Sequence, residues 1–195
     1  MTKSFRQVGQ TGVQILAWAQ VPIALLAVGL SIFVGLQIKP LMETKRDLEE
    51  QIDQSRKLLQ EYKTQLQNSR EAVRFVTLGI NAFHQGRYEA AVTSYNQALR
   101  LDSENAFILN LKGYSLFKSK SLKESIEALR RSVEVEPKYA WGYFDLARVY
   151  CADGDFKRSA EAIKKAVELR PDLKQTMRQD GEFKQLCKTV LSVLD

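Results

Sequence analysis

A short pattern recurs three times in the second half of this 195-residue chain. The copies read GRYEAAVTSYNQALRLD from Gly86, KSLKESIEALRRSVEVEP from Lys120 and GDFKRSAEAIKKAVELRP from Gly154. Each copy starts 34 residues after the one before it. A unit that returns at one fixed period of this length cannot bury its apolar face alone and has to stack on a copy of itself. The period predicts an all-α array of stacked helix pairs.

The array divides into three frames of equal length, which cover residues 72–105, 106–139 and 140–173. Each frame holds two helical patterns separated by a turn. Gly86 and Gly154 stand where a glycine with positive φ commonly ends a helix. Pro137 and Pro171 close the second helix of their frames, and Ser103 takes that place in the first.

The frames resemble the tetratricopeptide repeat, whose consensus asks for a bulky residue, Leu-Gly, an aromatic residue, a turn, and then Ala, an aromatic residue, Ala and Pro. The matching residues are Phe75, Leu78, Gly79, Ala91, Tyr95 and Ala98 in the first frame; Leu109, Gly113, Leu116, Leu129 and Pro137 in the second; and Tyr143, Leu146, Ala147, Tyr150, Ile163, Ala166 and Pro171 in the third. The departures are Ala82, Lys112, Ser125, Ser132 and Ser159.

The resemblance implies a superhelix whose concave face is lined by the first helix of each pair. The residues that it places in this groove are Val76, Ile80, Phe83, Phe107, Asn110, Tyr114, Phe117, Phe144 and Arg148, with Cys151 at the end. Such an apolar, aromatic groove suits an amphipathic helix or a short apolar segment of another protein. Asn110 is expected to bond to a peptide backbone and Arg148 to an acidic group. Two alternatives stay open: some aromatic residues belong to the core between repeats, or the chain's own terminal helix fills the groove.

One use of such grooves in the family is a clamp of Lys, Asn, Asn, Lys and Arg that grips the acidic carboxyl terminus of a chaperone. The matching positions here hold Val76, Ile80, Leu111, Trp141 and Asp145. None of them matches, and Asp145 would repel a carboxylate. The sequence therefore argues against a chaperone-tail clamp.

Residues 174–195 follow the last frame and contain a D-x-x-F-x-x-L pattern that starts at Asp180. The last helix pair of an array leaves an apolar face bare, which a final amphipathic helix covers. A capping helix is therefore expected, with Phe183, Leu186, Val190 and Leu194 as its covering stripe.

The front of the chain predicts a membrane anchor. After a tail of residues 1–14, the stretch 15–38 carries no charge and spans about 36 Å as a helix, enough for a hydrocarbon core of about 30 Å. Trp18 stands where an interfacial aromatic residue is expected. A cleaved signal peptide fits less well because the apolar run is too long and no A-x-A site closes it. A buried core helix fits less well because nothing that follows could surround it.

The flanking cations give the orientation. Lys3 and Arg6 precede the span, whereas Lys39, Lys45 and Arg46 follow it closely. This count slightly favours a cytoplasmic position for the carboxyl-terminal side. The expectation is a single-pass protein of a bacterial inner membrane, with a periplasmic repeat array as the alternative.

Residues 41–71 predict a helical stalk, because they contain no Gly or Pro and repeat apolar residues in heptads. The a positions are Lys45, Ile52, Leu59, Leu66 and Val73, and the d positions are Leu41, Leu48, Ser55, Tyr62 and Ser69. So narrow a stripe favours a coiled coil and a homo-oligomer. A solitary amphipathic helix folded back on the repeats is the alternative.

Composition and motifs argue against other functions. Beyond the anchor, 27 basic residues face 23 acidic ones, and so small an excess does not indicate nucleic-acid binding. His84 is the only histidine, and no phosphate loop, nucleophile elbow or metal-binding motif is present, so no catalytic, cofactor or metal site is expected. Cys151 and Cys187 lack metal or redox spacing and are expected to be buried small residues, with a single bridge left open.

These expectations together favour a membrane-anchored scaffold or adaptor that binds a protein through its repeats. A constitutive structural subunit of a membrane complex is the second interpretation. A translocation receptor for presequence-like helices is the third.

Overall fold

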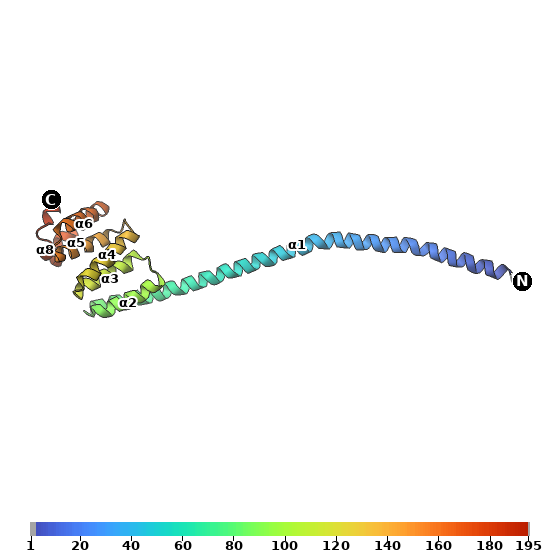
Figure 1. Ribbon diagram of the computed structural model, residues 1–195, viewed down its shortest axis with the longest axis horizontal. Helices are drawn as coiled ribbons and strands as arrows, with labels where there is room; N and C mark the ends of the chain where they lie inside the picture. The colour runs from blue at the N-terminus through green and yellow to red at the C-terminus, as the bar shows by residue number, and fades with distance from the viewer. Residues whose placement is uncertain (1–2, 195) are drawn as a thin grey trace. The chain divides into compact units, whose positions relative to one another are not determined.

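The computed structural model describes the backbone of residues 3–194 and the side chains of residues 25–192. Every regular element in the described part of the chain is helical. The chain forms two compact units, residues 1–62 and residues 63–195. The first unit consists of helix α1 (Lys3–His84) up to residue 62, and the second contains the end of α1 and all later helices (Figure 1).

Helix α1 joins regions that the sequence analysis had separated. It begins at Lys3, so the backbone is already helical where a tail of residues 1–14 was expected. It also continues through Pro40, which lies between the predicted span at 15–38 and the predicted stalk at 41–71. A proline inside a helix leaves the carbonyl four residues earlier without its usual donor. At this place that carbonyl belongs to residue 36, near the end of the apolar stretch, where water or lipid head groups can satisfy it.

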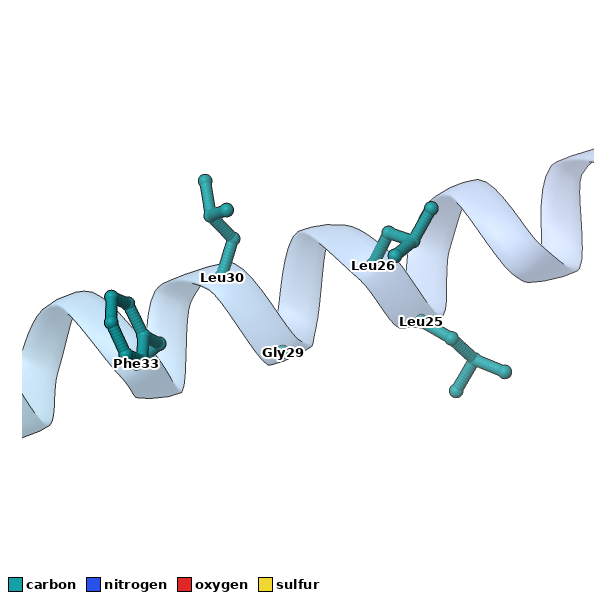
Figure 2. Close-up of a pocket in the computed structure, with 5 residues that line it drawn as sticks. All are labelled: Leu25, Leu26, Gly29, Leu30 and Phe33. Carbon is teal, nitrogen blue, oxygen red and sulfur yellow. The ribbon is translucent and has the colours of Figure 1, made fainter.

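The part of α1 that starts at Leu25 is long and apolar enough to cross a membrane, by length and composition. Its large side chains, among them Leu26, Leu30 and Phe33, project outward from the helix, and Gly29 leaves a notch between them (Figure 2). The side chains of residues 15–24, including the predicted interfacial Trp18, lie outside the described residues.

The second unit contains the predicted helix pairs. After the end of α1 come α2 (Tyr88–Leu101), α3 (Ala106–Lys118), α4 (Leu122–Val135), α5 (Ala140–Asp153) and α6 (Phe156–Leu169). Helices α3 and α5 begin at the first residues of the second and third frames, as the 34-residue period predicts. Each helix packs on the next from α2 to α6, and α3 also contacts α5, so the first helices of these pairs form an inner layer.

Close packing within each pair explains the small consensus residues. A Cβ atom added to Gly79 would lie 2.4 Å from the ring of Tyr95, and one added to Gly113 would lie 2.5 Å from Cγ of Leu129. Tyr95 and Leu129 are fully buried on the second helices, so neither can move aside easily. The glycines therefore set how closely the two helices of a pair approach.

Three serines stand where the consensus asks for alanine, and the structure gives each a backbone partner. The hydroxyl of Ser125 donates to the carbonyl of Gly113 and that of Ser132 to the carbonyl of Ala106, each at 2.7 Å. Ser159 makes the same bond to Ala147 at 2.9 Å. All three side chains are fully buried, and a buried hydroxyl is tolerated when it is hydrogen-bonded. These departures thus fasten the second helix of a pair to the first.

The turns within the three pairs share one geometry. Gly86 and Gly154 have φ of 71° and 81°, as predicted, and Lys120 takes the equivalent place in the second pair with φ of 68°. The next N–H donates across each turn, for example from Ser121 to the carbonyl of Leu116 at 2.9 Å. Because a side chain is strained at positive φ, Lys120 is the one turn residue of the three that pays a steric cost.

Replacing Lys120 by glycine is therefore expected to raise the free energy of unfolding of residues 63–195 by about 1 kcal/mol, since glycine adopts this φ without strain. Denaturant unfolding followed by circular dichroism measures the change. The control is Glu127→Gly at an exposed position in the middle of α4, which should lower stability by about 1 kcal/mol. A loss of stability in both variants would contradict the explanation.

The end of the chain folds into short elements and not into one capping helix. These are α7 (Leu173–Gln179), α8 (Gly181–Leu186) and the 3-10 helix η1 (Leu191–Leu194). The break comes at Asp180, whose extended backbone lets its carboxylate accept the N–H of Phe183 at 2.6 Å and cap α8. Helix α7 and η1 contact α6, and α8 contacts α5, so this segment covers the last pair. Phe183 and Val190 are buried, as the covering stripe requires, and the side chain of Leu194 lies outside the described residues.

Candidate protein-binding face

The predicted groove residues divide into an open set and a covered set. Phe107, with 47% of its surface exposed, is the most accessible, and five others are half-buried: Val76, Ile80, Phe83, Tyr114 and Phe117. Three are buried, with exposures of 6% for Asn110, 3% for Phe144 and 4% for Arg148. All nine residues were predicted to line one groove, but the buried three do not line an open surface.

An aromatic row connects the first two pairs. The ring of Phe83 on α1 lies 5.4 Å from that of Tyr114 on α3, and Tyr114 lies 6.1 Å from Phe117. Val76, Ile80 and Phe83 also pack against the buried cluster around Tyr95. The row is therefore partly core and partly surface, which is one of the alternatives left open above.

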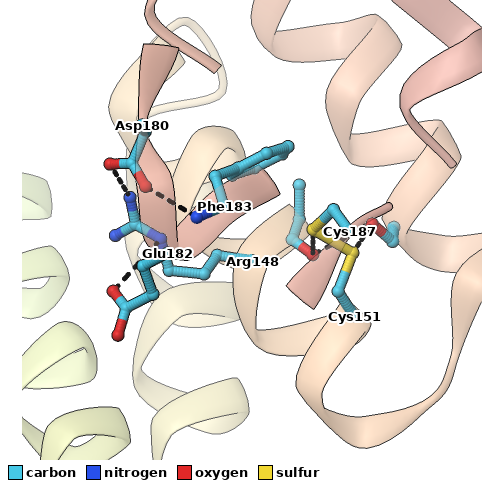
Figure 3. Close-up of a disulfide and its surroundings, with 8 residues drawn as sticks. Arg148, Cys151, Asp180, Glu182, Phe183 and Cys187 are labelled. Carbon is cyan, nitrogen blue, oxygen red and sulfur yellow. Dashed lines mark hydrogen bonds and ion pairs between the residues drawn. A yellow bond between two sulfur atoms is a disulfide. The ribbon is translucent and has the colours of Figure 1, made fainter. Parts of the chain in front are cut away.

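The terminal segment, which consists of α7, α8 and η1, covers the carboxyl-terminal end of the inner layer. The ring of Phe183 on α8 is fully buried and stacks on Phe144, with centroids 5.3 Å apart. Figure 3 shows Phe183 beside Arg148, with Asp180 and Glu182 turned toward the guanidinium group. At the carboxyl-terminal end of the inner layer, the chain therefore fills part of its own groove, which is the second alternative given above.

Arg148 is the centre of this contact. Its guanidinium donates to Asp145 at 2.8 Å and to Asp180 at 2.9 Å, and lies 3.7 Å from Glu182. It also lies over the rings of Tyr114 and Phe144, at 4.8 Å from each centroid. A buried arginine needs such partners, because an unpaired buried charge is strongly destabilising. Arg148 was predicted to bind an acidic group of a partner protein. Its guanidinium group is instead bound to acidic residues of the same chain.

Glu182 links the terminal segment to α3. Its carboxylate accepts a hydrogen bond from Tyr114 Oη at 2.9 Å and from Lys118 Nζ at 2.8 Å. Burial alone would raise the pKa of Glu182, but these two hydrogen bonds and the charges of Lys118 and Arg148 together outweigh it and hold the pKa below its usual value. Burial raises the pKa of Tyr114, and Glu182 adds to that rise, so the phenol stays protonated and keeps donating.

Asp145 has the opposite environment. It is buried against Arg148 and accepts a hydrogen bond from Asn110 at 3.0 Å. Burial raises its pKa to about 6, although Arg148 and Asn110 act against the rise, and the acids Asp180 and Glu182 add to it. The folded state therefore binds a proton at Asp145 more tightly than the unfolded chain does.

This shift gives stability a pH dependence. Lowering the pH from 7 to 5 is expected to raise the free energy of unfolding of residues 63–195 by about 1 kcal/mol, because the raised pKa favours proton uptake by the folded state. Denaturant unfolding at pH 7, 6 and 5 measures it. Asp145→Asn serves as the control and should lose this rise. An identical pH profile for the two proteins would contradict the assignment to Asp145.

The polar residues around Arg148 were not predicted from the sequence. Neither Lys118 nor Glu182 was a candidate, and Asp180 was noted only as the first residue of the D-x-x-F-x-x-L pattern. The available signal was the D-x-x-F-x-x-L pattern, which identified the apolar cover but not its ionic partners.

A disulfide fixes the terminal segment a second time. Cys151 on α5 is joined to Cys187, directly after α8, and both are buried (Figure 3). The burial agrees with the sequence analysis, and the bridge that it left open is present. Arg148, Phe144 and the bridge thus hold the segment along one side of α5.

These contacts leave the amino-terminal end of the inner layer open. The accessible surface there is formed by Phe107 and by the half-buried Val76, Ile80, Phe83, Tyr114 and Phe117, which we call the open face. It is apolar apart from the Tyr114 hydroxyl, which is already bonded to Glu182.

Comparison with known families agrees with the repeat frames. A sequence profile described as "TPR repeat" matches residues 82–120, and one described as "Tetratricopeptide repeat" matches residues 108–139 and 142–173. The last two matches fall within the second and third frames and end at their last residues. Residues 72–81, at the start of the first frame, lie outside these matches.

Similar proteins share only part of their length with this chain. DnaJ homolog subfamily C member 3 of Gallus gallus is 24% identical over 132 residues, which cover 68% of this chain and 26% of that protein. Protein STIP1 homolog of Dictyostelium discoideum is 22% identical over 109 residues, or 56% of this chain and 19% of that protein. The chain thus spans about a quarter or less of these relatives.

Solved structures share the fold. The Arabidopsis OM64 TPR domain has a TM-score of 0.55 at 16% identity and covers 64% of this chain and 98% of its own. MamA has a TM-score of 0.53 at 22% identity, with coverages of 68% and 78%. The first TPR of Spaghetti (RPAP3), bound to the HSP90 peptide SRMEEVD, has a TM-score of 0.55 at 17% identity, with coverages of 65% and 94%. The helix pairs over residues 82–173 of this chain are therefore tetratricopeptide repeats, stacked as an α-solenoid.

Proposed function

We propose that the chain is a membrane-anchored scaffold or adaptor, without catalytic activity, that binds another protein through the open face. The observation that carries the proposal is this face itself, because its apolar and aromatic side chains stay accessible at one end of the inner layer while the terminal segment covers the other end. Tetratricopeptide repeats mediate protein–protein interactions, which supports a protein partner.

An amphipathic helix or a short apolar segment is the partner that fits. Phe107 can insert between apolar side chains of such a segment, and the flanking rings offer further apolar area. The acidic HSP90 peptide of the Spaghetti (RPAP3) complex fits poorly, because Val76, Ile80, Leu111 and Trp141 are uncharged and Asp145 is committed to Arg148.

The apolar stretch of α1 supports an anchor at residues 15–38, and the disulfide supports a side of the membrane. Disulfides persist in oxidising compartments and are rare in the cytosol. We therefore place the repeats on the oxidising, non-cytoplasmic side, against the slight cytoplasmic preference from the flanking cations.

Site-specific photocrosslinking of the full chain in its native membrane tests the proposal. A photoreactive phenylalanine at Phe107 is expected to capture one defined protein, identified by mass spectrometry. The same residue at Phe156, which is 40% exposed on the second helix of the last pair, is the matched control. Phe83→Asp in the open face should abolish capture from position 107. Equal capture at both positions, or capture that survives Phe83→Asp, would refute the open face as the binding site.

Two further interpretations have distinct outcomes. A structural subunit of a membrane complex would be recovered at fixed stoichiometry after mild detergent extraction. A translocation receptor would capture presequence-like helices of many different proteins at position 107. An adaptor should instead release its defined partner during extraction.

A further inference from the structure

We propose that a second copy of this chain packs in parallel along one continuous face of α1, from residue 27 in the membrane span to residue 62 in the stalk. This inference concerns the first unit and does not depend on the open face. We call the surface the pairing face.

The stalk part of the pairing face is an exposed heptad stripe. Its large apolar members are between 49% and 68% exposed: Leu41, Leu48, Ile52, Leu59 and Tyr62. They follow the a and d positions of a 3.5-residue repeat, which keeps a stripe facing one partner helix over several turns. A globular surface would call for a wider apolar stripe.

The same register continues without interruption into the span. Counting back from Leu41 at d, the preceding a and d positions are Ile38, Val34, Ser31 and Ala27. Helix α1 is unbroken across Pro40, so the two parts share one phase. The pairing face therefore does not end where the chain enters the membrane.

Side-chain size within the span agrees with this register. Ala27 and Ser31 on the pairing face are small and are followed by Val34 and Ile38, whereas the outer c and f positions of the span hold the bulky Leu26, Phe33 and Leu36, with Gly29 as their one small member. Small residues let two membrane helices approach closely. The hydroxyl of Ser31 donates to the carbonyl of Ala27 at 2.8 Å, so it requires no partner in the lipid. Figure 2 shows how far Leu26 and Phe33 project from the helix.

The charges along α1 are compatible with a parallel second copy. In parallel pairing each e residue faces a g residue of the other helix, so Glu49 would face Thr44 and Arg56 would face Gln51. No like charges meet at these places. Two copies inserted in one membrane with the same orientation are also parallel and in register. A neutral g row against a charged e row is thus compatible with self-pairing.

Lys45 is the charged a residue of the face. A lysine at a costs stability but fixes register and strand number. It lies seven residues beyond the span and its Nζ is 3.6 Å from Glu49 of the same helix, which partly compensates its charge. From residue 27 to residue 62 the face is about 54 Å long, at about 1.5 Å per residue.

Cysteine crosslinking of the full-length protein in membranes tests the pairing face. Single variants Ser31→Cys in the span and Ser55→Cys in the stalk are expected to form a disulfide-linked dimer of twice 22.2 kDa on mild oxidation. The matched controls are Phe33→Cys and Gln54→Cys, each on an outer c position, which should stay monomeric. Mass photometry of the purified wild type in detergent should give two chains per particle.

Each outcome decides the proposal. Crosslinks at residues 31 and 55 with none at 33 and 54 support it. A crosslink at 55 alone overturns the continuation into the membrane. Equal crosslinking at outer positions, a monomeric wild type, or crosslinks only to a different protein overturn pairing with a second copy.

Discussion

Replacing Phe183 by alanine should lower the free energy of unfolding of residues 63–195 by about 4 kcal/mol. The side chain is fully buried and stacks on Phe144, so its removal loses both the transfer free energy of a large ring and the contacts around the cavity that remains. Denaturant unfolding monitored by circular dichroism measures the loss. Protease cleavage between residues 173 and 195 should accelerate in parallel, because the segment would open locally.

Phe107→Ala is the matched control. It also removes a phenylalanine ring, but from a site on an inner-layer helix that is 47% exposed. The free energy of unfolding should therefore change by about 0.5 kcal/mol or less. The two variants thus separate the covered end of the inner layer from the open end. Similar losses from both would mean that Phe107 is core and that the open face is smaller than proposed.

The helix pairs and two of their turns could be predicted from the sequence. The 34-residue period predicted the helix pairs, and the first helices of the second and third pairs begin where the frames begin. Gly86 and Gly154 ended their helices as expected, because positive φ is a local property that one residue type signals. The positive φ of Lys120 could not be predicted from its residue type, since the geometry of its turn is imposed by the helices on either side.

The candidate site was harder to predict because it depends on contacts between distant segments. The consensus assigns Phe144 and Arg148 to the groove through their positions on the first helix. Whether such positions stay open is decided by residues 32 and more positions away, here Asp180 and Phe183. The repeat pattern carries no information about these partners, because the terminal segment is not a repeat.

The break in the terminal segment illustrates the same limit. The spacing of Phe183, Leu186 and Val190 is compatible with one helix, and the burial of Phe183 and Val190 was predicted. The side chain of Asp180, however, bonds both to the N–H of Phe183 and to Arg148, which favours an extended backbone at this residue. A tertiary ion pair thus reinforces a local alternative to the helix.

The second large effect should come from the disulfide. Replacing both Cys151 and Cys187 by alanine is expected to lower the free energy of unfolding by about 3 to 4 kcal/mol, because the bridge closes a loop with a sequence separation of 36 residues. Most of this effect acts on the unfolded chain, which gains freedom when the bridge is absent. Denaturant unfolding of residues 63–195 measures it without reductant.

A reductant supplies the control. The wild type with a phosphine reductant should become as unstable as Cys151→Ala/Cys187→Ala, whereas the double variant should not respond to it. A wild type that is indifferent to reductant would contradict the bridge. In the native membrane, maleimide should label no cysteine of the denatured full chain before reduction and both afterwards. Labelling before reduction would place the repeats in a reducing compartment.

The two large effects should not add fully, because both act on the segment that carries Phe183 and Cys187. With the bridge intact, Phe183→Ala leaves this segment tethered to α5, so it can still cover part of the inner layer. Without the bridge, the stacking of Phe183 and the ion pairs of Arg148 must hold the segment unaided. A double-mutant cycle between Phe183→Ala and Cys151→Ala/Cys187→Ala should therefore give a coupling free energy of about 1 kcal/mol or more. A coupling near zero would show that the ring and the bridge stabilise the repeats independently.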